Sequence, residues 1–374
     1  MATIPTAEQD PTLQAIDAAM VRRSAEDARP YLGASSIGQP CSRRLWYVFR
    51  WACVEQFDAA TLYRFEDGHR TEDLLAARLR MVPGVQLHTL DPRSGKQFAV
   101  EECAGHFRGH LDGAVLGLLQ APKTWSVWEA KAVGDDKLAK LRKAKAEHGE
   151  KAALAAWDGI YYAQAIIYMH LTGMTRHYLT ASSPGGRVTE SVRTNEDKAE
   201  AARLIDKARR IVESPTPPAG ISDDPAFYQC KFCPAANVCH RSEGVQVNCR
   251  TCVHATPEMD GNGRWSCARH RKDVSTDEQR KGCAEHRLIP DLMPWAKVVS
   301  ADEGENWIEY TTPAGGKFFN GGELGWTSAE LVLGPKIAGL VSDPVLAEIK
   351  GEFGAVAVKA DGPAWMRPGI GRVA

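Results

Sequence analysis

The sequence has almost no net charge and no long apolar run. Its 46 Lys and Arg residues are balanced by 47 Asp and Glu residues, which gives a formal net charge of −1. A protein that coats nucleic acid with a uniformly basic surface is therefore not expected, although a local basic groove fits this balance. Residues 1–20 lack the apolar core of a signal peptide, and no segment is apolar over the length of a bilayer. We expect a cytoplasmic protein that does not enter membranes.

The composition also lacks the biases of fibrous and disordered proteins. With 44% hydrophobic and 25% charged residues, it is typical of a soluble globular protein and excludes a collagen-like repeat, a coiled coil or a disordered tail protein. We find no internal repeat. A chain of 374 residues can hold one large domain or two to three smaller ones.

Cysteine is the first informative residue type that is present. Of the 10 cysteines, eight lie in Cys-x2-Cys pairs or where they could complete a four-ligand set with such a pair. In a reducing compartment these pairs indicate metal or cluster binding rather than disulfides. Cys53 and Cys103 stand apart, and we expect them in the core because cysteine is often buried.

Two carboxylates and a lysine form the most specific pattern. Strand-like runs over 107–115 and 126–132 carry Asp112 on the first and Glu129 and Lys131 on the second. Because strand side chains alternate, Glu129 and Lys131 should share a face, and a hairpin can bring Asp112 alongside. Carboxylate oxygens suit Mg²⁺ or Mn²⁺, and a lysine beside the metal could orient or deprotonate a water for attack on phosphorus.

This arrangement resembles the PD-(D/E)XK nuclease superfamily, and further features resemble its RecB-like branch. His69 follows a glycine in a helix predicted over 61–82, where that branch places a metal-binding histidine. Gln164 and Tyr168 in QAIIY fit the Gln-x3-Tyr helix of the branch. Cysteines flank the core as in the iron–sulfur nucleases of the AddB type and the CRISPR-associated RecB-like nucleases. The resemblance covers about residues 35–240.

The resemblance implies a role for each matched residue. His69, Asp112 and Glu129 would hold Mg²⁺ or Mn²⁺, and Lys131 would position the attacking water. Gln164 and Tyr168 would support the site or touch the DNA strand. The individual residues also have structural interpretations, since Glu-x-Lys on a strand, a lone helical histidine and a surface Gln–Tyr pair are all common.

The first cysteine set combines one segment with a distant residue. Cys230, Cys233 and Cys239 lie in CKFCPAANVC, one thiolate short of a cubane cluster. The resemblance implies that Cys41 is the fourth ligand and that the cofactor is a [4Fe–4S] cluster, which would close a long loop and stabilise the fold. A zinc ion in the same four thiolates is the alternative that the spacing leaves open.

The second set begins with a Cys-x2-Cys turn typical of zinc knuckles and continues with two isolated cysteines. Its members are Cys249, Cys252, Cys267 and Cys283. We expect zinc, with His270 and His286 as alternative ligands.

Basic residues gather at two places. Eight of them, with Trp265, surround the second cysteine set, and a second group lies over 137–151. Such residues could bind phosphates while Trp265 stacks on a base, or they could form an ordinary solvated surface.

We therefore predict an α/β fold: a PD-(D/E)XK restriction-endonuclease-like core, in which helices flank a mixed sheet, with a cysteine-rich metal-binding module and a small C-terminal α+β domain. The predicted parts are an N-terminal arm (1–30), a RecB-like nuclease domain with an iron–sulfur staple (31–240), a zinc-binding module (241–290) and a small domain (291–374). In the last, WIEYTT and GKFFNG should be strands and SAELVLGPKIAGL a helix.

The predicted function is metal-dependent hydrolysis of DNA phosphodiester bonds. The resemblance suggests an exonuclease of recombination or end processing, from a bacteriophage or bacterium, with a single-strand annealing protein as a partner. The alternatives are a nucleic-acid-binding protein that keeps the fold without cutting, and a nuclease directed at RNA.

Overall fold

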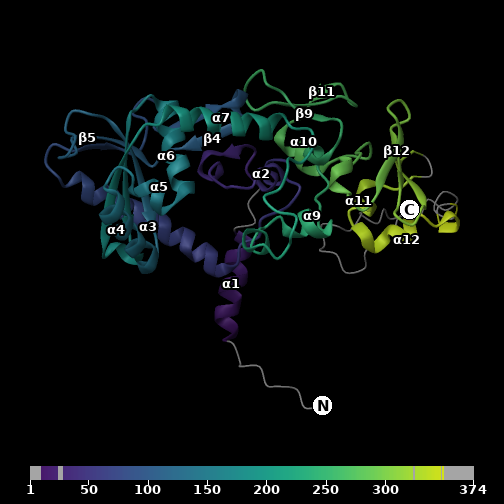
Figure 1. Ribbon diagram of the computed structural model, residues 1–374, viewed down its shortest axis with the longest axis horizontal. Coiled ribbons are helices and arrows are strands. Elements are labelled where there is room, and N and C mark those ends of the chain that lie inside the picture. The colour runs from purple at the N-terminus through teal and green to yellow at the C-terminus, as the bar shows by residue number, and fades with distance from the viewer. Residues whose placement is uncertain (1–9, 24–27, 323–324, 347, 349–374) are drawn as a thin grey trace, which may run out of the picture. The chain divides into compact units, whose positions relative to one another are not determined.

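The computed structural model describes residues 10–23, 28–322, 325–346 and 348, and the chain divides into two compact units (Figure 1). Unit 1 comprises Met1–Phe49, Glu55–Ser214 and Pro257–Arg264; unit 2 comprises Arg50–Val54, Pro215–Thr256 and Trp265–Ala374. Parts of the predicted N-terminal arm (1–9 and 24–27) and of the predicted C-terminal domain (323–324, 347 and 349–374) lie outside the described residues. Within the described part, no helix is both long enough and apolar enough to cross a membrane.

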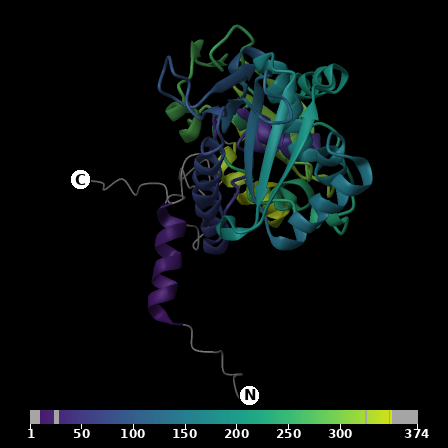
Figure 2. The same ribbon diagram turned by 90° about the vertical axis from the view of Figure 1, so that its left-hand side faces the viewer.

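Unit 1 is a mixed α/β structure built on a five-stranded sheet with the order β2-β5-β6-β7-β8 (Figure 2). The strands are β2 (Gln86–His88), β5 (Gly113–Leu116), β6 (Ser126–Ala132), β7 (Arg176–Ser182) and β8 (Thr189–Asn195). Neighbouring strands are antiparallel except β6 and β7, which are parallel. The prediction for β6 is confirmed with its bounds.

The strand predicted over 107–115 is two strands in two different sheets. β4 (Phe107–His110) lies in a small sheet with the order β1-β4-β3, between β1 (Leu32–Gly33) and β3 (Ala99–Glu102). The strand breaks at Leu111 and Asp112 before β5 begins. Asp112 therefore lies at the junction of two sheets instead of at the end of one strand.

The connection from β6 to β7 is helical because parallel strands cannot be joined by a tight turn. It consists of α4 (Asp135–His148), α5 (Ala153–Trp157) and α6 (Gly159–Thr172). The Asp158 side chain caps α6 by accepting the N–H groups of Ile160 and Tyr161, and Gly173 ends the helix at a φ of 73°. The helix expected to carry Gln164 and Tyr168 is thus found as α6, with its start at the capping aspartate.

The other helices of unit 1 precede and follow the sheet. They are α1 (Pro11–Arg23), α2 (Ser42–Phe49), α3 (Ala59–Arg80) and α7 (Lys198–Glu213). The helix predicted over 61–82 corresponds to α3, which Asp58 caps by accepting the N–H of Thr61.

Two apolar clusters show how the sheet is buried. One joins α4, α5 and α6 to β7 and β8; its members include Leu138, Leu141, Leu154, Ala165, Leu179 and Val192. The other joins α3 to β2, β5 and β6; its members include Leu75, Ala76, Leu87, Val115, Trp128 and Ala130. Since side chains alternate along β6, Glu129 points away from the face that Trp128 and Ala130 bury against α3.

Unit 2 consists of short elements. They are α8 (Tyr228–Lys231), α9 (Ala236–Arg241), β9 (Ala255–Pro257), β10 (Trp265–Cys267), β11 (Lys272–Asp273), α10 (Thr276–Lys281), β12 (Lys297–Asp302), β13 (Trp307–Thr311), β14 (Lys317–Gly321), α11 (Ser328–Leu331) and α12 (Ala338–Val341). The two strands predicted in WIEYTT and GKFFNG are confirmed as β13 and β14, which pair antiparallel. The single helix predicted over 328–340 is wrong, because Gly334 at a φ of 68° and Pro335 interrupt it.

The cysteine-rich segment and the C-terminal sheet belong to the same unit and share hydrogen bonds. The N–H of Leu288 donates to Asn320 Oδ1 at 3.0 Å, and the Ser328 hydroxyl donates to the His286 carbonyl at 3.0 Å. The Arg287 guanidinium donates to the carbonyl of Asn306. Residues 286–288 are therefore held by partners that follow them in the chain.

Candidate active site

The hairpin of β5 and β6 brings Asp112 and Glu129 together. Gly113 pairs with Trp128 in the strand register, so the residue before β5 meets the middle of β6. Asp112 Oδ2 accepts the backbone N–H of Ala130 at 2.8 Å. The predicted approach of Asp112 to the Glu129–Lys131 strand is therefore found.

Two glycines make room for this arrangement. A Cβ atom at Gly109 would lie 2.5 Å from Cε1 of Tyr168, and one at Gly113 would lie 2.7 Å from the His88 carbonyl oxygen. Both distances are shorter than real Cβ contacts. The sequence GHLDG therefore holds Asp112 between two points where only glycine fits.

Glu129 and Lys131 project from the same face of β6, as their spacing predicted. Lys131 Nζ contacts Glu129 Oε1, and Gln164 Nε2 on α6 donates to the same oxygen at 2.8 Å. Glu129 is buried, with 2% of its surface exposed. Its second oxygen, Oε2, is buried without a hydrogen-bond partner among the described residues. A buried carboxylate oxygen is costly to leave unpaired, so this atom needs a further ligand.

Gln164 and Tyr168 lie one turn apart on α6 and belong to the same network. The Tyr168 hydroxyl donates to the carbonyl of His110 at 2.8 Å, and Gln164 Nε2 lies 3.3 Å from that hydroxyl. Both side chains are buried. Of the two predicted roles, burial favours support of the site over contact with a DNA strand.

Helix α3 contributes His69 and a residue that the sequence analysis did not select, Glu72. His69 is exposed and lies within electrostatic range of Asp112. Glu72 is half-buried; burial, followed by the charge of Asp112, raises its pKa to about 7 although Lys131 opposes this. The available signal was helical spacing, because Glu72 follows His69 by three residues.

The site holds more negative than positive groups. Burial raises the pKa values of Asp112 and Glu129, with Lys131 opposing the increase in both. Burial lowers the pKa of Lys131, but the charges of Glu129 and Asp112 outweigh it and raise that pKa overall. Three carboxylates thus face one half-buried lysine, and a divalent cation would relieve their repulsion.

An aromatic and a second lysine lie next to Lys131. Lys131 Nζ is 5.2 Å from the ring centre of Tyr161, and Lys137 Nζ is 4.3 Å from the same ring. Lys137 also forms an ion pair with Asp158 at 2.7 Å. Nothing in the spacing of the sequence pointed to Tyr161, since the contact depends on the path of the crossover.

The donor set fits a hard divalent ion, although the described side chains do not form a closed coordination sphere. In this part of the chain, no group of three or more His, Cys, Asp or Glu residues is arranged so that it could hold a metal ion as it stands. Glu129 Oε2, which has no partner among the described residues, and the nearby carboxylates are oxygen donors of the kind that Mg²⁺ and Mn²⁺ take.

The two predicted cysteine sets are distributed differently. Cys41 belongs to unit 1, and Cys230, Cys233 and Cys239 belong to unit 2. Their assignment as iron–sulfur ligands stays a prediction from the sequence. All four members of the second set lie in unit 2 and line one cavity there.

The basic residues around the second cysteine set are mostly engaged within the protein. The ion pairs are Arg264–Asp260, Arg269–Glu285, Lys272–Glu278 and Arg280–Asp277. Trp265 is 1% exposed, and its ring lies 4.7 Å from the guanidinium of the buried Arg250. The idea that Trp265 stacks on a base is therefore wrong, because an internal cation already covers its ring.

No protein-family model matches the sequence, and no curated protein matches it either. Among solved structures, the chain is similar to the protein SSO0001, with 15% identity and a TM-score of 0.34 over 62% of this chain and 98% of that one. It is similar to the alkaline exonuclease LHK-Exo from Laribacter hongkongensis, with 14% identity and a TM-score of 0.34 over 53% of this chain and 90% of that one. The same exonuclease in complex with dAMP gives 15% identity and a TM-score of 0.35 over the same shares. Because these TM-scores are below 0.5, the likeness does not establish a shared fold or activity.

Proposed function

We propose that this protein is a metal-dependent nuclease that hydrolyses phosphodiester bonds in DNA. The observation that carries the proposal is the meeting of Asp112, Glu129 and Lys131 at the β5–β6 hairpin, with the buried Glu129 Oε2 lacking a partner among the described residues. A purely structural ion pair would match one carboxylate to one cation and satisfy both oxygens. Here the carboxyl groups outnumber the lysine, and one oxygen remains available for a ligand.

Each residue then has a defined part. Asp112 and Glu129 would hold Mg²⁺ or Mn²⁺, with His69 and Glu72 of α3 on the side facing Asp112; the ion would supply charge to stabilise the phosphate transition state. Lys131 orients the attacking water. Burial lowers the pKa of Lys131, but the charges of Glu129 and Asp112 raise it overall, so the side chain stays a cation. Gln164 is a positioning residue that fixes Glu129 Oε1, and Tyr168 fixes Gln164 in turn.

Exonuclease action in recombination or end processing, with a single-strand annealing protein as partner, is part of the proposal as the resemblance implies it. Hydrolysis itself depends only on the site. Exonuclease and endonuclease action can be separated by experiment. A circular DNA substrate is cleaved only by an endonuclease, whereas a linear one is cleaved by either kind of enzyme.

The test uses the full-length protein with end-labelled linear DNA, circular DNA and a matched RNA. We expect cleavage of linear DNA with Mg²⁺ or Mn²⁺, none with EDTA, and a loss of at least about 10²-fold in Asp112→Asn and Glu129→Gln. Glu150→Gln is the control. Glu150 forms an ion pair with Arg193 in the same unit, so this variant also loses a paired carboxylate but should cleave normally.

Three results would contradict the proposal. Near-wild-type cleavage by Glu129→Gln would remove the site assignment. Cleavage of RNA without cleavage of DNA would mean that the substrate is RNA. Tight DNA binding without cleavage under any metal condition would favour the non-cutting alternative.

A further inference from the structure

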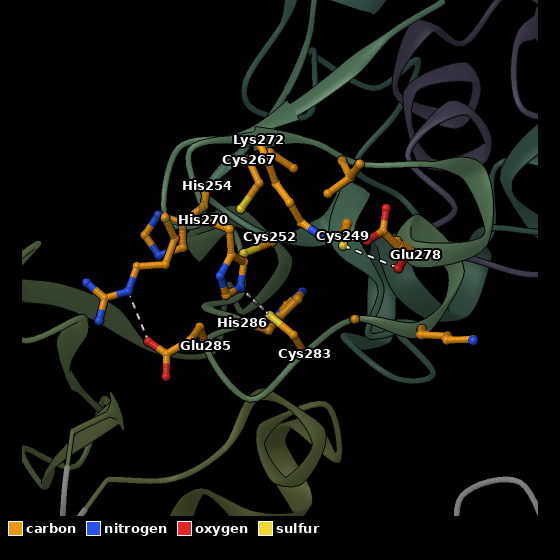
Figure 3. A pocket seen from close by; sticks show the side chains of 15 residues that line it. Cys249, Cys252, His254, Cys267, His270, Lys272, Glu278, Cys283, Glu285 and His286 are labelled. Atoms are coloured by element: carbon orange, nitrogen blue, oxygen red, sulfur yellow. Dashed lines mark hydrogen bonds and ion pairs between the residues drawn. The ribbon is translucent and has the colours of Figure 1, made fainter.

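Unit 2 contains a cavity of about 240 Å³ whose wall carries four cysteines (Figure 3). The cysteines come from three separate stretches of the chain: a short 3-10 helix over Cys249–Thr251 with the residue after it, the strand β10, and the loop after α10. They are Cys249, Cys252, Cys267 and Cys283. None of these residues takes part in the carboxylate site.

The four thiols line one cavity, so they are neighbours although they come from different stretches of the chain. Thiolates this close repel one another, whereas a soft divalent cation binds several of them at once.

A backbone donor and a cross-strand basic residue lie beside two of the cysteines. The backbone N–H of Arg287 donates to Cys252 Sγ at 3.4 Å. Cys267 pairs with Lys272 across the β10–β11 hairpin. N–H donors and nearby cations offset the net negative charge of a zinc ion held by four thiolates.

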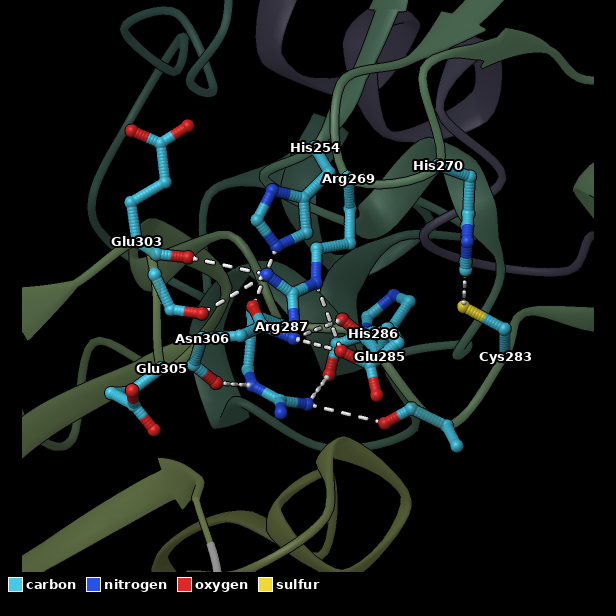
Figure 4. Close-up of polar contacts among 12 residues, drawn as sticks. His254, Arg269, His270, Cys283, Glu285, His286, Arg287, Glu303, Glu305 and Asn306 are labelled. Atoms are coloured by element: carbon cyan, nitrogen blue, oxygen red, sulfur yellow. Dashed lines mark hydrogen bonds and ion pairs between the residues drawn. The ribbon is translucent and has the colours of Figure 1, made fainter.

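Most of the competing ligands around the cavity have other partners. Glu278 pairs with Lys272 at 2.6 Å and Glu285 with Arg269 at 3.0 Å. His254 Nε2 lies 2.8 Å from Asn306 Oδ1, in the network shown in Figure 4. Zinc binding by the carboxylates or by this histidine would break these contacts, and thiolates are the softer ligands that zinc favours.

Two further histidines line the cavity. His270 Nε2 is 3.5 Å from Cys283 Sγ, a contact in which the ring can donate to a thiolate (Figure 4). His286 Nε2 lies 2.9 Å from the carbonyl of Asn248, and its Nδ1 is buried with no partner among the described residues. His286 is therefore the histidine that could exchange with a cysteine, and it is included in the experiment.

We propose that Cys249, Cys252, Cys267 and Cys283 bind one zinc ion that orders unit 2. The sulfurs surround the cavity without meeting at one point, so binding requires the side chains to turn inward. It also replaces the Cys249 S–H contact to the Glu278 carbonyl, 3.5 Å long, and releases the thiol protons to solvent. The site is independent of phosphodiester cleavage, because its residues belong to the other unit.

The experiment measures zinc and iron in the full-length protein, purified without chelators, by elemental analysis. We expect each of Cys249→Ser, Cys252→Ser, Cys267→Ser and Cys283→Ser to lose one zinc equivalent. Cys53→Ser, which changes a buried cysteine outside the cavity, and Cys233→Ser, which changes the other predicted set, should keep it. His270→Ala and His286→Phe should also keep it.

A second measurement covers variants that fail to fold. Cobalt substituted into the unaltered protein should give the charge-transfer and visible bands of a tetrahedral cobalt–thiolate site, and zinc should displace it. Absence of both zinc and the cobalt spectrum overturns the proposal, as does zinc that all four serine variants retain. Loss of zinc in His286→Phe together with retention in one cysteine variant overturns the four-thiolate ligand set. Neither readout uses nucleic acid, so failure here is distinguishable from failure of the nuclease proposal.

Discussion

The carboxylate site of unit 1 and the cysteine cavity of unit 2 gather reactive side chains in opposite ways. Glu129 and Lys131 stand on a regular strand whose register and alternation fix their direction, and Gln164 returns over them on a long helix. The cysteines come from turns and from elements of six residues or fewer. In a regular strand or helix, the position of a residue in the sequence predicts the direction of its side chain. In a turn, the sequence gives only the residue type and its spacing.

The two regions also differ in what a metal would do. The carboxylate site is packed into a sheet with apolar clusters around it, and it already holds a lysine between its carboxylates. The cysteine region has short elements and would gain cohesion from a shared ion. We therefore expect metal to be needed for chemistry in unit 1 and for stability in unit 2.

The largest expected effect comes from Lys131→Met, which keeps the length of the side chain but removes its charge. Cleavage should fall by about 10³-fold, because the water-orienting cation is lost. The folded content measured by circular dichroism should stay unchanged. Lys140→Met on the exposed face of α4 is the control. If Lys131→Met cleaved within a few-fold of wild type, Lys131 would be a structural residue, and the proposed role of the carboxylate site in catalysis would be contradicted.

Metal removal should separate the two regions next. Gel filtration into metal-free buffer without a chelator should remove loosely bound Mg²⁺ and abolish cleavage, and added Mg²⁺ should restore it, with little change in the unfolding temperature. A mercurial that displaces zinc from thiolates should instead lower the unfolding temperature of unit 2. Calorimetry of the full chain checks both, and equal thermal effects of the two treatments would contradict the division of roles.

A smaller effect is expected from Glu72→Gln. Since Glu72 faces Asp112 and Lys131 from α3, its loss should raise the Mg²⁺ concentration for half-maximal cleavage by about 10-fold. The rate at saturating metal should change little. Glu66→Gln on the same helix, where Glu66 pairs with Arg70, serves as the matched control. An unchanged metal requirement would limit the site to the strand residues.

The smallest effect concerns His177, a buried residue of β7 whose Nδ1 has no partner among the described residues. Burial lowers its pKa to about 3. The unfolded state therefore binds the proton first, and stability is lost as the pH falls below about 6.5. His177→Phe should reduce the loss of stability between pH 7.5 and pH 5.5 by about 1 kcal/mol, measured by urea unfolding. Identical pH dependence in the two proteins would show that His177 is protonated without cost.

The side-chain directions along β6 could be predicted from the sequence. The common face of Glu129 and Lys131 follows from strand alternation, whereas the Gln164–Tyr168 helix was expected from the resemblance. That resemblance left support of the site and contact with DNA open, and the contact of Gln164 with Glu129 depends on the path of the crossover through α4 and α5. The burial of Trp265 against Arg250 could not be predicted, because the two residues lie in separate stretches of the chain and meet only through the path of the turns between them.

Residues 286–288 have a practical consequence for shortening the gene. A stop codon placed after position 290 would retain every cysteine of the cavity but delete the partners of His286, Arg287 and Leu288, which are Ser328, Asn306 and Asn320. Three buried polar groups next to Cys283 would then lose their hydrogen bonds at once. A truncated protein prepared to study the cysteine cavity should therefore extend at least through Ser328.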